Sequence, residues 1–186
     1  NWTQATGSAA WSGRDNLQAA SFDGALWILG GNTGPANPQN DTWYSYDGAN
    51  WSERTPVPWD ARINHRCVVF DGRLWLIGGS GASFYNDVWV MEGGEDEPWD
   101  GVTGAEWREV TAAGAWSARD DHACAVYDDK VWVMGGYAQR NDVWFSANGE
   151  SWTEATSSAA WGDRTSLAST AFAGKLWISG GRDSAG

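Results

Sequence analysis

Short apolar runs alternate along this chain with clusters of Gly, Asp and Asn. Segments such as CVVF, LWLI, VWVM and VWFS are about four residues long and are rich in Trp and β-branched residues. Apolar runs of this length, bounded by turn-forming residues, are typical of buried and half-buried β-strands. No segment shows the spacing of apolar positions that an amphipathic helix requires. The pattern therefore predicts an all-β protein.

One ten-residue sequence occurs four times. It consists of an aromatic residue, a two-residue turn, an apolar run and a double glycine, and its copies are FDGALWILGG, FDGRLWLIGG, YDDKVWVMGG and FAGKLWISGG at residues 22–31, 70–79, 127–136 and 172–181. The double glycines are 48, 57 and 45 residues apart. A period of this length indicates repeated units that each form one small sheet.

Each unit also contains an arginine at the same place, namely Arg14, Arg62, Arg119 and Arg164. A Trp lies three residues before this arginine, an aromatic residue eight after it, a second Trp thirteen after it, and the double glycine starts sixteen after it. Three units continue with NDTW or NDVW and then a further Trp. Trp2 matches this last Trp, so we expect it to lie in a strand.

These recurring motifs resemble those of kelch-repeat β-propellers, and the resemblance extends over the whole chain. It is carried by the Arg-x-x-His sequences of the second and third units, by the double glycines and by the aromatic pairs. The resemblance implies four-stranded antiparallel blades around a common axis, each burying the apolar faces of its neighbours. The chain departs from the pattern at Leu17 and Leu167, which replace the histidine, and at Ala173, which replaces the turn Asp.

The resemblance also divides the chain. We expect the last strand of a preceding blade in residues 1–10, full blades in 11–58, 59–115 and 116–160, and the first two strands of a further blade in 161–186. The total is fifteen strands, or about three and three-quarter blades. Because the unpaired edges of such an arc are avoided in soluble proteins, we expect part of a larger propeller or assembly and not a closed four-bladed ring.

Composition narrows the range of partners. The net charge of −12 argues against nucleic acid and anionic membrane surfaces, which demand Lys and Arg patches. No apolar run approaches the roughly 18 residues of a membrane span. The 16 Trp residues occupy nearly every aromatic position of the repeat. In this they resemble secreted and cell-surface kelch proteins, which implies an extracellular or cell-surface location.

The repeated arginines allow two interpretations. Several arginines that converge on a propeller axis would form a clamp for a carboxylate ligand. An arginine at the same place in every unit more simply binds carbonyl groups between blades, or the Asp of the NDxW motif. We favour the structural role and predict that all four arginines are buried and hydrogen-bonded.

The remaining candidates for chemistry also occupy repeat positions. His65 and His122 share one slot, and Cys67 and Cys124 share another that is filled by small residues in the other units. Copper oxidases with kelch repeats need a His and Tyr ligand set for the metal and a Cys near a Tyr for the cofactor, and only the Cys124 and Tyr127 pair has a counterpart here. We therefore predict structural histidines, free thiols, no catalytic residues, no cofactor and no metal site.

Two further features are local. The acidic insertion at residues 92–106 (EGGEDEPWDGVTGAE) lacks the regular Asp spacing of a calcium loop, so we expect a solvated loop. The Asn-x-Ser/Thr sequences are at Asn1, Asn40 and Asn50, and chance accounts for one or two such matches.

Recognition is expected at loops that vary while the strands do not. In an up-and-down blade, residues 32–39, 80–85 and 137–140 share one end of the blades with the residues after each arginine, and we call this end the loop face. The insertion should lie on the opposite face. The candidate binding residues on the loop face are Asn64, Phe84, Tyr85, Asp120, Asp121, Tyr137 and Arg140.

The sequence thus favours a non-catalytic module that binds a protein or a glycan within a larger extracellular or surface protein. The alternative is the propeller portion of an extracellular oxidase or glycan-active enzyme whose catalytic residues lie outside this segment. Nothing in the sequence assembles a nucleophile with its base, a carboxylate pair or a metal cluster.

Overall fold

The computed structural model describes residues 1–55, 57–92, 106–137 and 140–183, and these contain fourteen strands and no helix. The first sheet contains β1 (Gln18–Phe22), β2 (Ala25–Leu29), β3 (Thr42–Ser45) and β4 (Ser52–Arg54). The second contains β5 (Arg66–Phe70), β6 (Arg73–Ser80), β7 (Phe84–Glu92) and β8 (Trp107–Thr111). The third contains β9 (Ala123–Tyr127), β10 (Lys130–Met134), β11 (Val143–Ser146) and β12 (Thr153–Thr156). The last is the hairpin of β13 (Ala168–Phe172) and β14 (Lys175–Ser179).

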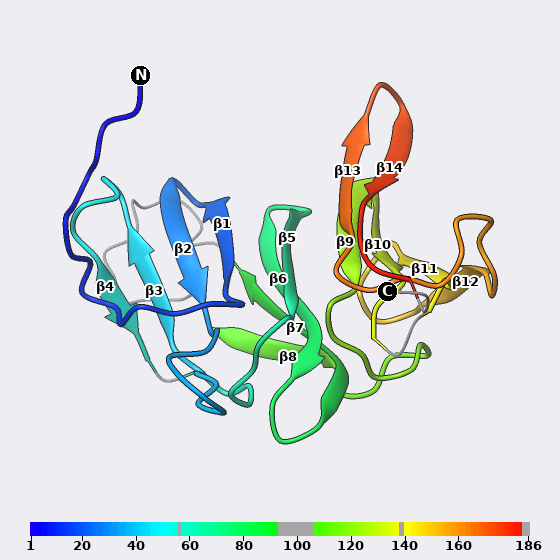
Figure 1. The fold of residues 1–186 in the computed structure, drawn as a ribbon, viewed down its shortest axis with the longest axis horizontal. Helices are drawn as coiled ribbons and strands as arrows, with labels where there is room; N and C mark the ends of the chain where they lie inside the picture. The colour runs from blue at the N-terminus through cyan, green and yellow to red at the C-terminus, as the bar shows by residue number, and fades with distance from the viewer. Residues whose placement is uncertain (56, 93–105, 138–139, 184–186) are drawn as a thin grey trace.

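The sheets follow one another around an open arc (Figure 1). Each is an antiparallel meander, and β1, β5, β9 and β13 lie along its inner side. The inner strands of successive sheets touch, but no strand of the β1–β4 sheet contacts the β13–β14 hairpin within the described residues. The fold is therefore an all-β propeller arc and not a closed four-bladed ring, as the sequence predicted.

One expected strand is absent. Residues 1–10 form no strand, and Trp2 is fully exposed at 101%. We expected the last strand of a preceding blade here. A strand requires a partner for its main-chain hydrogen bonds, and no main-chain hydrogen bond joins residues 1–10 to a described strand. The observed total is consequently fourteen strands and not fifteen.

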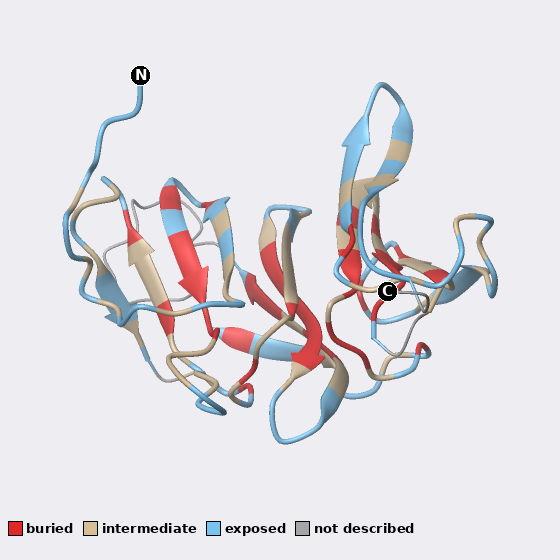
Figure 2. Ribbon diagram, viewed as in Figure 1, coloured by how far each residue is buried: buried red, intermediate tan, exposed pale blue. Residues whose placement is uncertain are grey.

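The core lies between the sheets, because each full sheet is apolar on both faces. Leu74 and Leu76 of β6 pack with Trp27 of the first sheet. Trp75 and Ile77, on the other face of β6, pack with the third sheet. Figure 2 shows the buried residues concentrated in the middle strands. This explains why the strands lack a clean alternation of polar and apolar residues.

A repeated tryptophan closes each inner hairpin. The indole N–H of Trp27, the second Trp of the first unit, donates a hydrogen bond of 2.9 Å to the main-chain carbonyl of Phe22. Trp75, Trp132 and Trp177 make the same bond to Phe70, Tyr127 and Phe172. The fixed five-residue spacing of the aromatic and the Trp is thus the spacing of a hydrogen-bonded pair across a two-residue turn.

Main-chain hydrogen bonds join each sheet to the next at three equivalent places. At the first junction the Arg62 N–H donates to the Gln39 carbonyl, the Gly31 N–H donates to the Arg62 carbonyl, and the Asn64 N–H donates to the Asn16 carbonyl. The junctions centred on Arg119 and Arg164 repeat all three bonds at 2.9–3.1 Å. The sheets therefore sit in a fixed register that does not depend on side-chain identity.

The double glycine is required for two reasons: its backbone conformation has positive φ angles, and neighbouring atoms leave no room for a side chain. Gly30 and Gly31 have positive φ angles of 52° and 95°. A Cβ atom at Gly31 would lie 2.8 Å from the Asp15 carbonyl oxygen and from the Leu17 side chain. The equivalent glycine, Gly79, meets His65 in the same way. The glycines thus lie at the loop-face end of each second strand, where the residue in the histidine or leucine slot passes directly over the backbone.

The sequences at residues 45–51 and 146–152 form the same turn. In the second, the N–H groups of Glu150 and Ser151 both donate to the Asn148 side chain, and Gly149 has a φ of 73°. In the first, Gly48 has a φ of 74°. The two glycines differ in their surroundings. A Cβ atom at Gly149 would overlap the indole ring of Trp75, whereas at Gly48 its nearest contact would be 3.6 Å away.

This difference predicts unequal costs for the same substitution. Gly48→Ala should lower the free energy of unfolding by about 1–2 kcal/mol, because it imposes only a left-handed conformation on alanine. Gly149→Ala should lower it by about 1–3 kcal/mol more, because it also displaces a core tryptophan. Urea unfolding of the two variants measures the difference. Equal losses would show that Trp75 moves aside without cost.

Candidate functional site

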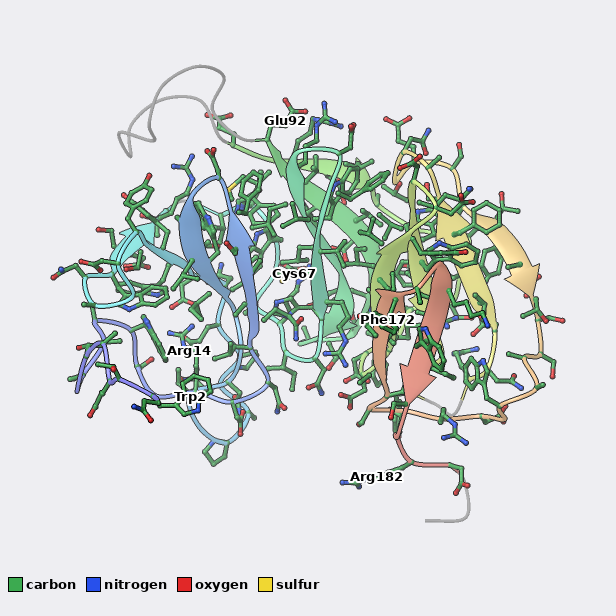
Figure 3. The ribbon with its side chains drawn as sticks, turned by 90° about the horizontal axis from the view of Figure 1, so that it is seen from above. Trp2, Arg14, Cys67, Glu92, Phe172 and Arg182 are labelled. Atoms are coloured by element: carbon green, nitrogen blue, oxygen red, sulfur yellow. The ribbon has the colours of Figure 1, made fainter. Side chains whose placement is uncertain are left out.

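The loop face forms where the expected segments meet at one end of the sheets. Isolated bridges link Asp15 to Asn32 and Ile63 to Ser80, so the segment after each arginine lies against the segment after each double glycine. Figure 3 shows Arg182, which bridges to Thr165 in the same way, at the opposite end of the molecule from Glu92. Glu92 ends β7, so the insertion begins away from the loop face, while residues 93–105 lie outside the described residues.

Two exposed aromatic rings meet on the loop face. Phe84 begins β7 of the second sheet, and Tyr137 follows the double glycine of the third. Their ring centroids are 5.4 Å apart and the planes are inclined by only 18°, so the rings are stacked. Phe84 is 45% exposed and Tyr137 is 52% exposed. The pair thus forms an apolar surface across the junction of two sheets.

Tyr85 does not share this exposure, although we expected it to. Its ring lies over the guanidinium group of Arg62, 4.3 Å from ring centroid to carbon, and it is half-buried. A cation stacked on an aromatic face stabilises both groups. Strand alternation explains the difference, because Phe84 and Tyr85 are neighbours in β7 and point to opposite faces.

A groove lies beside these aromatics on the second sheet. It encloses about 360 Å³ and is lined by residues that include Asp60, Phe84, Tyr85 and Glu109. Sequence reasoning missed Asp60 and Glu109, which are far apart in the chain and carry no motif. The groove brings together an exposed ring and three carboxylates, of which Asp87 is paired with Arg62.

A polar cluster occupies the inner part of the loop face. The Ser80 hydroxyl donates to Asp120 at 2.6 Å, and the Asn64 amide lies 3.4 Å from both Asp120 and Asp121. Asp120 is buried, whereas Asp121 is half-buried. Partial burial, and then the charge of Asp120, raises the pKa of Asp121. The structure thus brings three predicted residues together, with Asp121 the more accessible carboxylate.

Arg140 is the last of the predicted binding residues, and its main chain helps to join the third sheet to the final hairpin. Its N–H donates to the Gly136 carbonyl, and its own carbonyl accepts from the Arg164 N–H. The residue is half-buried. It lies close to Tyr137 in the chain, and its buried Nε has no hydrogen-bond partner among the described residues. The binding role of all seven residues stays a prediction.

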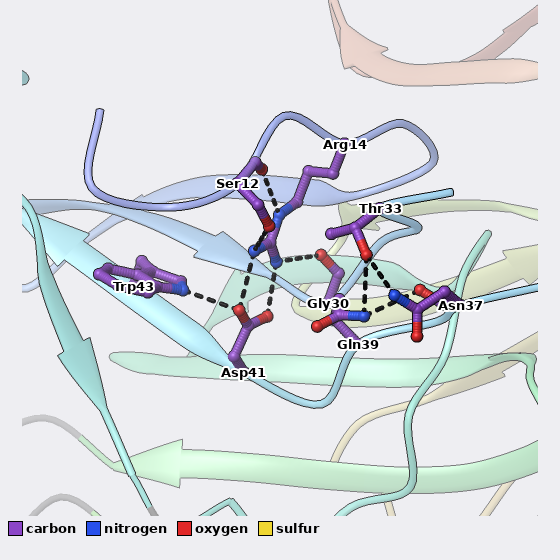
Figure 4. Close-up of polar contacts among 8 residues, drawn as sticks. All are labelled: Ser12, Arg14, Gly30, Thr33, Asn37, Gln39, Asp41 and Trp43. Atoms are coloured by element: carbon purple, nitrogen blue, oxygen red, sulfur yellow. Dashed lines mark hydrogen bonds and ion pairs between the residues drawn. The ribbon is translucent and has the colours of Figure 1, made fainter. Parts of the chain in front are cut away.

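The repeated arginines form no ligand clamp. Arg14 donates to both carboxylate oxygens of Asp41 and to the Gly30 carbonyl, and Trp43 donates to the same carboxylate (Figure 4). Burial raises the pKa of Asp41, but the hydrogen bonds from Arg14 and Trp43 outweigh it and hold the pKa below its ordinary value. Arg62 with Asp87 and Arg119 with Asp142 repeat the arrangement.

The prediction for the arginines is therefore confirmed for three of them. Their side chains are 0–1% exposed and bidentately paired. Arg164 is hydrogen-bonded but only half-buried. The sequence left open whether the partners lie within or between blades. The side chains bind within their own sheet, whereas the main chains of Arg62, Arg119 and Arg164 bond to the preceding sheet.

The histidines are fully buried packing elements. His65 lies between Gly30 of the first sheet and Gly79 of its own, and Trp59 lies beside it with ring centroids 6.5 Å apart. No ring nitrogen of either histidine makes a hydrogen bond with a described residue. Burial, and then the charge of Arg62, lowers the pKa of His65 to about 3, which the nearby Leu29 carbonyl opposes slightly. The pKa of His122 is lowered for the same main reason.

The cysteines are free thiols that fill a small-residue slot, as predicted. The thiol of Cys67 contacts the Ala19 carbonyl at 3.6 Å, and the Ser169 hydroxyl donates to the Cys124 carbonyl at 2.8 Å. The residue in this slot thus contacts the residue in the same slot of the preceding sheet. Both thiols are half-buried, and their surroundings raise the pKa of each to about 12 by desolvation.

Among the described residues, no three His, Cys, Asp or Glu side chains gather closely enough to hold a metal ion. The described part of the chain also contains no helix with the length and apolarity for crossing a membrane.

The arc of meanders, the arginine–aspartate pairs and the double glycines together define a kelch-type β-propeller domain. The chain belongs to the kelch family, because residues 16–186 match the model described as the KLHDC2/KLHL20/DRC7 Kelch-repeats domain. Domains of this kind are typically protein-interaction modules.

The comparison with solved structures agrees on the fold. The chain is similar to a protein described as "Structure of YjhT", with a TM-score of 0.68 and 15% sequence identity. The match covers 90% of this chain and 59% of that one, so this chain spans well under two thirds of its length. At this identity the likeness concerns the fold alone. No curated protein matches the chain.

Proposed function

We propose that this chain is a non-catalytic interaction module, at the cell surface or outside the cell, that binds a protein partner through its loop face. The observation that carries the proposal is the exposed stack of Phe84 and Tyr137. The kelch family supports a protein as the partner.

The stacked rings are suited to binding because they are already ordered. Aromatic side chains dominate interface energetics when a partner desolvates them. Each ring restricts the other, so little conformational entropy remains to be lost on binding. The two rings also lie beside a rigid junction, because the Arg119 N–H donates to the Tyr85 carbonyl and so joins the second sheet to the third.

Charge indicates the chemistry of the partner. Asp120 and Asp121 lie on the same face, and Asp60 and Glu109 line the groove beside Phe84. The whole chain carries a net charge of −12. Complementary charge accelerates association and selects among partners. The preferred ligand is therefore a protein segment with an apolar or aromatic side chain flanked by Lys or Arg.

Selection from a displayed random-peptide library tests this function. We expect enriched peptides to be basic and to contain an apolar anchor. Phe84→Ala and Tyr137→Ala should each weaken their binding about 5- to 30-fold, as loss of a hot-spot residue does. Tyr46→Ala is the matched control, because Tyr46 is 54% exposed and follows β3 at the opposite end of the sheet.

Two outcomes would contradict the proposal. Peptide binding that is unchanged in both loop-face variants but lost in Tyr46→Ala would place the site on the other face. Binding of oligosaccharides on a glycan array, abolished by the same two substitutions and without peptide enrichment, would identify a glycan as the ligand instead.

A further inference from the structure

The groove on the second sheet lies between complete sheets. Its lining residues belong to β7, to β8, or to the segments directly before β5 and after β8. The sheets before and after it each contain four strands. Its volume of about 360 Å³ is at the lower end of the roughly 300–1,000 Å³ of ligand pockets. The groove therefore has room for one long side chain.

Two of the three carboxylates in this groove are unpaired. Asp87 is bound to Arg62, whereas Asp60 and Glu109 are exposed and form no ion pair with a described residue. Glu109 lies directly opposite Trp89 in the β7–β8 ladder, so the two side chains project from the same face of the sheet. The groove thus combines two uncompensated negative charges with aromatic side chains.

This combination is specific to the second sheet. Asp60 lies two residues before the repeated arginine, and Tyr85 is the residue whose carbonyl accepts from the N–H of the next arginine. In the first and third sheets the same two positions hold Ser12 with Gln39 and Ser117 with Arg140. Those sheets form the same meander with these other residues. The acidic and aromatic lining of the groove is therefore not a requirement of the fold.

The lining selects a cation as the occupant. An apolar side chain would desolvate the two unpaired carboxylates without compensation. A cation offsets their charge and is attracted to aromatic faces. Arginine suits the site better than lysine, because its planar guanidinium stacks on rings and binds carboxylates through two parallel hydrogen bonds. The groove wall already contains this arrangement, since Tyr85 stacks on the Arg62 guanidinium, which binds both oxygens of Asp87.

We propose that the groove is a pocket for one arginine side chain of the protein partner, with Asp60 and Glu109 as the groups that bind its guanidinium. This inference rests on the proposed function and makes it more specific. Phe84 lines the groove and also stacks on Tyr137. The apolar anchor of the partner therefore lies on the stacked rings, and an arginine close to it in the partner sequence enters the groove.

Titration of the tripeptide acetyl-Gly-Arg-Gly-amide into the nitrogen-15-labelled chain tests the pocket. The indole N–H of Trp89 reports on the site, because Trp89 lines the groove and donates to Asp87. Its signal is identified by its absence from a Trp89→Phe variant. We expect the tripeptide to shift this signal at millimolar concentration. The citrulline analogue has the same shape without the charge and should bind about tenfold more weakly. The lysine analogue should bind more weakly than the arginine tripeptide.

Substitution of the two carboxylates should weaken binding of the arginine tripeptide. Asp60→Asn and Glu109→Gln should each reduce the affinity about 2- to 5-fold, as expected for exposed ion pairs. Both residues are exposed, so these variants are expected to fold. Glu53→Gln is the matched control, because Glu53 is exposed and lies opposite Trp43 in the first sheet as Glu109 lies opposite Trp89. This control should bind like the wild type.

Three results would overturn the pocket. They are equal binding of the arginine and citrulline tripeptides, lysine binding as tight as that of arginine, and equal losses in Glu53→Gln and Glu109→Gln. Each of these results leaves the proposed function standing. Failure of the proposed function is read separately, from the binding of library peptides by Phe84→Ala and Tyr137→Ala.

Discussion

Replacement of Arg62 by Gln is expected to lower the free energy of unfolding by about 3–5 kcal/mol at neutral pH. The Arg62 side chain is fully buried and binds both oxygens of Asp87, each at 2.8 Å, together with the Gly78 carbonyl. Glutamine would leave the partly buried carboxylate without its counter-charge. Urea unfolding at constant pH and salt measures the loss.

Arg164→Gln provides the internal comparison. Arg164 holds the same repeat position but binds only carbonyl groups, so its replacement should cost about 1–2 kcal/mol. A loss as large as that of Arg62→Gln would mean that the carboxylate contributes little and that the carbonyl contacts stabilise the sheet.

Replacement of both buried histidines by Leu is expected to remove acid sensitivity between pH 6.5 and 5. The folded pKa of His65 is about 3, below the value near 6.5 in the unfolded chain. Its contribution to stability is thus complete above pH 6.5 and is lost as the pH falls, because only the unfolded chain gains the proton. The loss is roughly 2 kcal/mol at pH 5 for such a histidine. His122, whose pKa is also lowered, adds a loss of the same sign.

The chain itself supplies the replacement. Leu17 and Leu167 already hold this slot and pack against Gly31 and Gly181 as the histidines pack against Gly79 and Gly136. Unfolding midpoints from pH 7 to 5 should therefore fall for the wild type and stay nearly level for the double variant. The reciprocal Leu167→His variant should gain acid sensitivity, because Leu167 is buried. Identical pH profiles for wild type and double variant would refute the assignment.

Features that recur at fixed spacing were predictable from the sequence. Arg62, its Asp87 partner and Gly78 recur as a set, because one hydrogen-bonded arrangement builds every sheet. The same logic identified the free Cys67 as a small-residue filler. Spacing could not say that the arginine side chain binds within its own sheet, because that depends on the direction in which the side chain leaves the loop.

Features that depend on one particular neighbour were not predictable. Tyr85 was expected to be exposed, but the nearby Arg62 guanidinium covers it. Trp2 matches a strand position in sequence, yet a strand forms only beside a partner. The groove near Glu109 likewise depends on how β7, β8 and the preceding loop meet. The segments of the loop face do lie against one another as expected, but the stacking of Phe84 on Tyr137 depends on how two sheets meet and could not be predicted.

The three main-chain bonds at each junction affect how a repeat protein of this kind can evolve. Each junction uses the N–H and carbonyl of the arginine, the second glycine and a residue in the left-handed region (Asn16, Asn64, Asp121 or Ser166). Apart from the glycine, these bonds place no demand on side chains, so gene duplication or loss of one whole unit preserves every joint. The number of units is therefore free to drift, whereas deletion of a single residue between the arginine and the glycine is not tolerated. The main-chain bonds of a unit moved to another position would form there as well, whereas its side chains would have to pack against new neighbours.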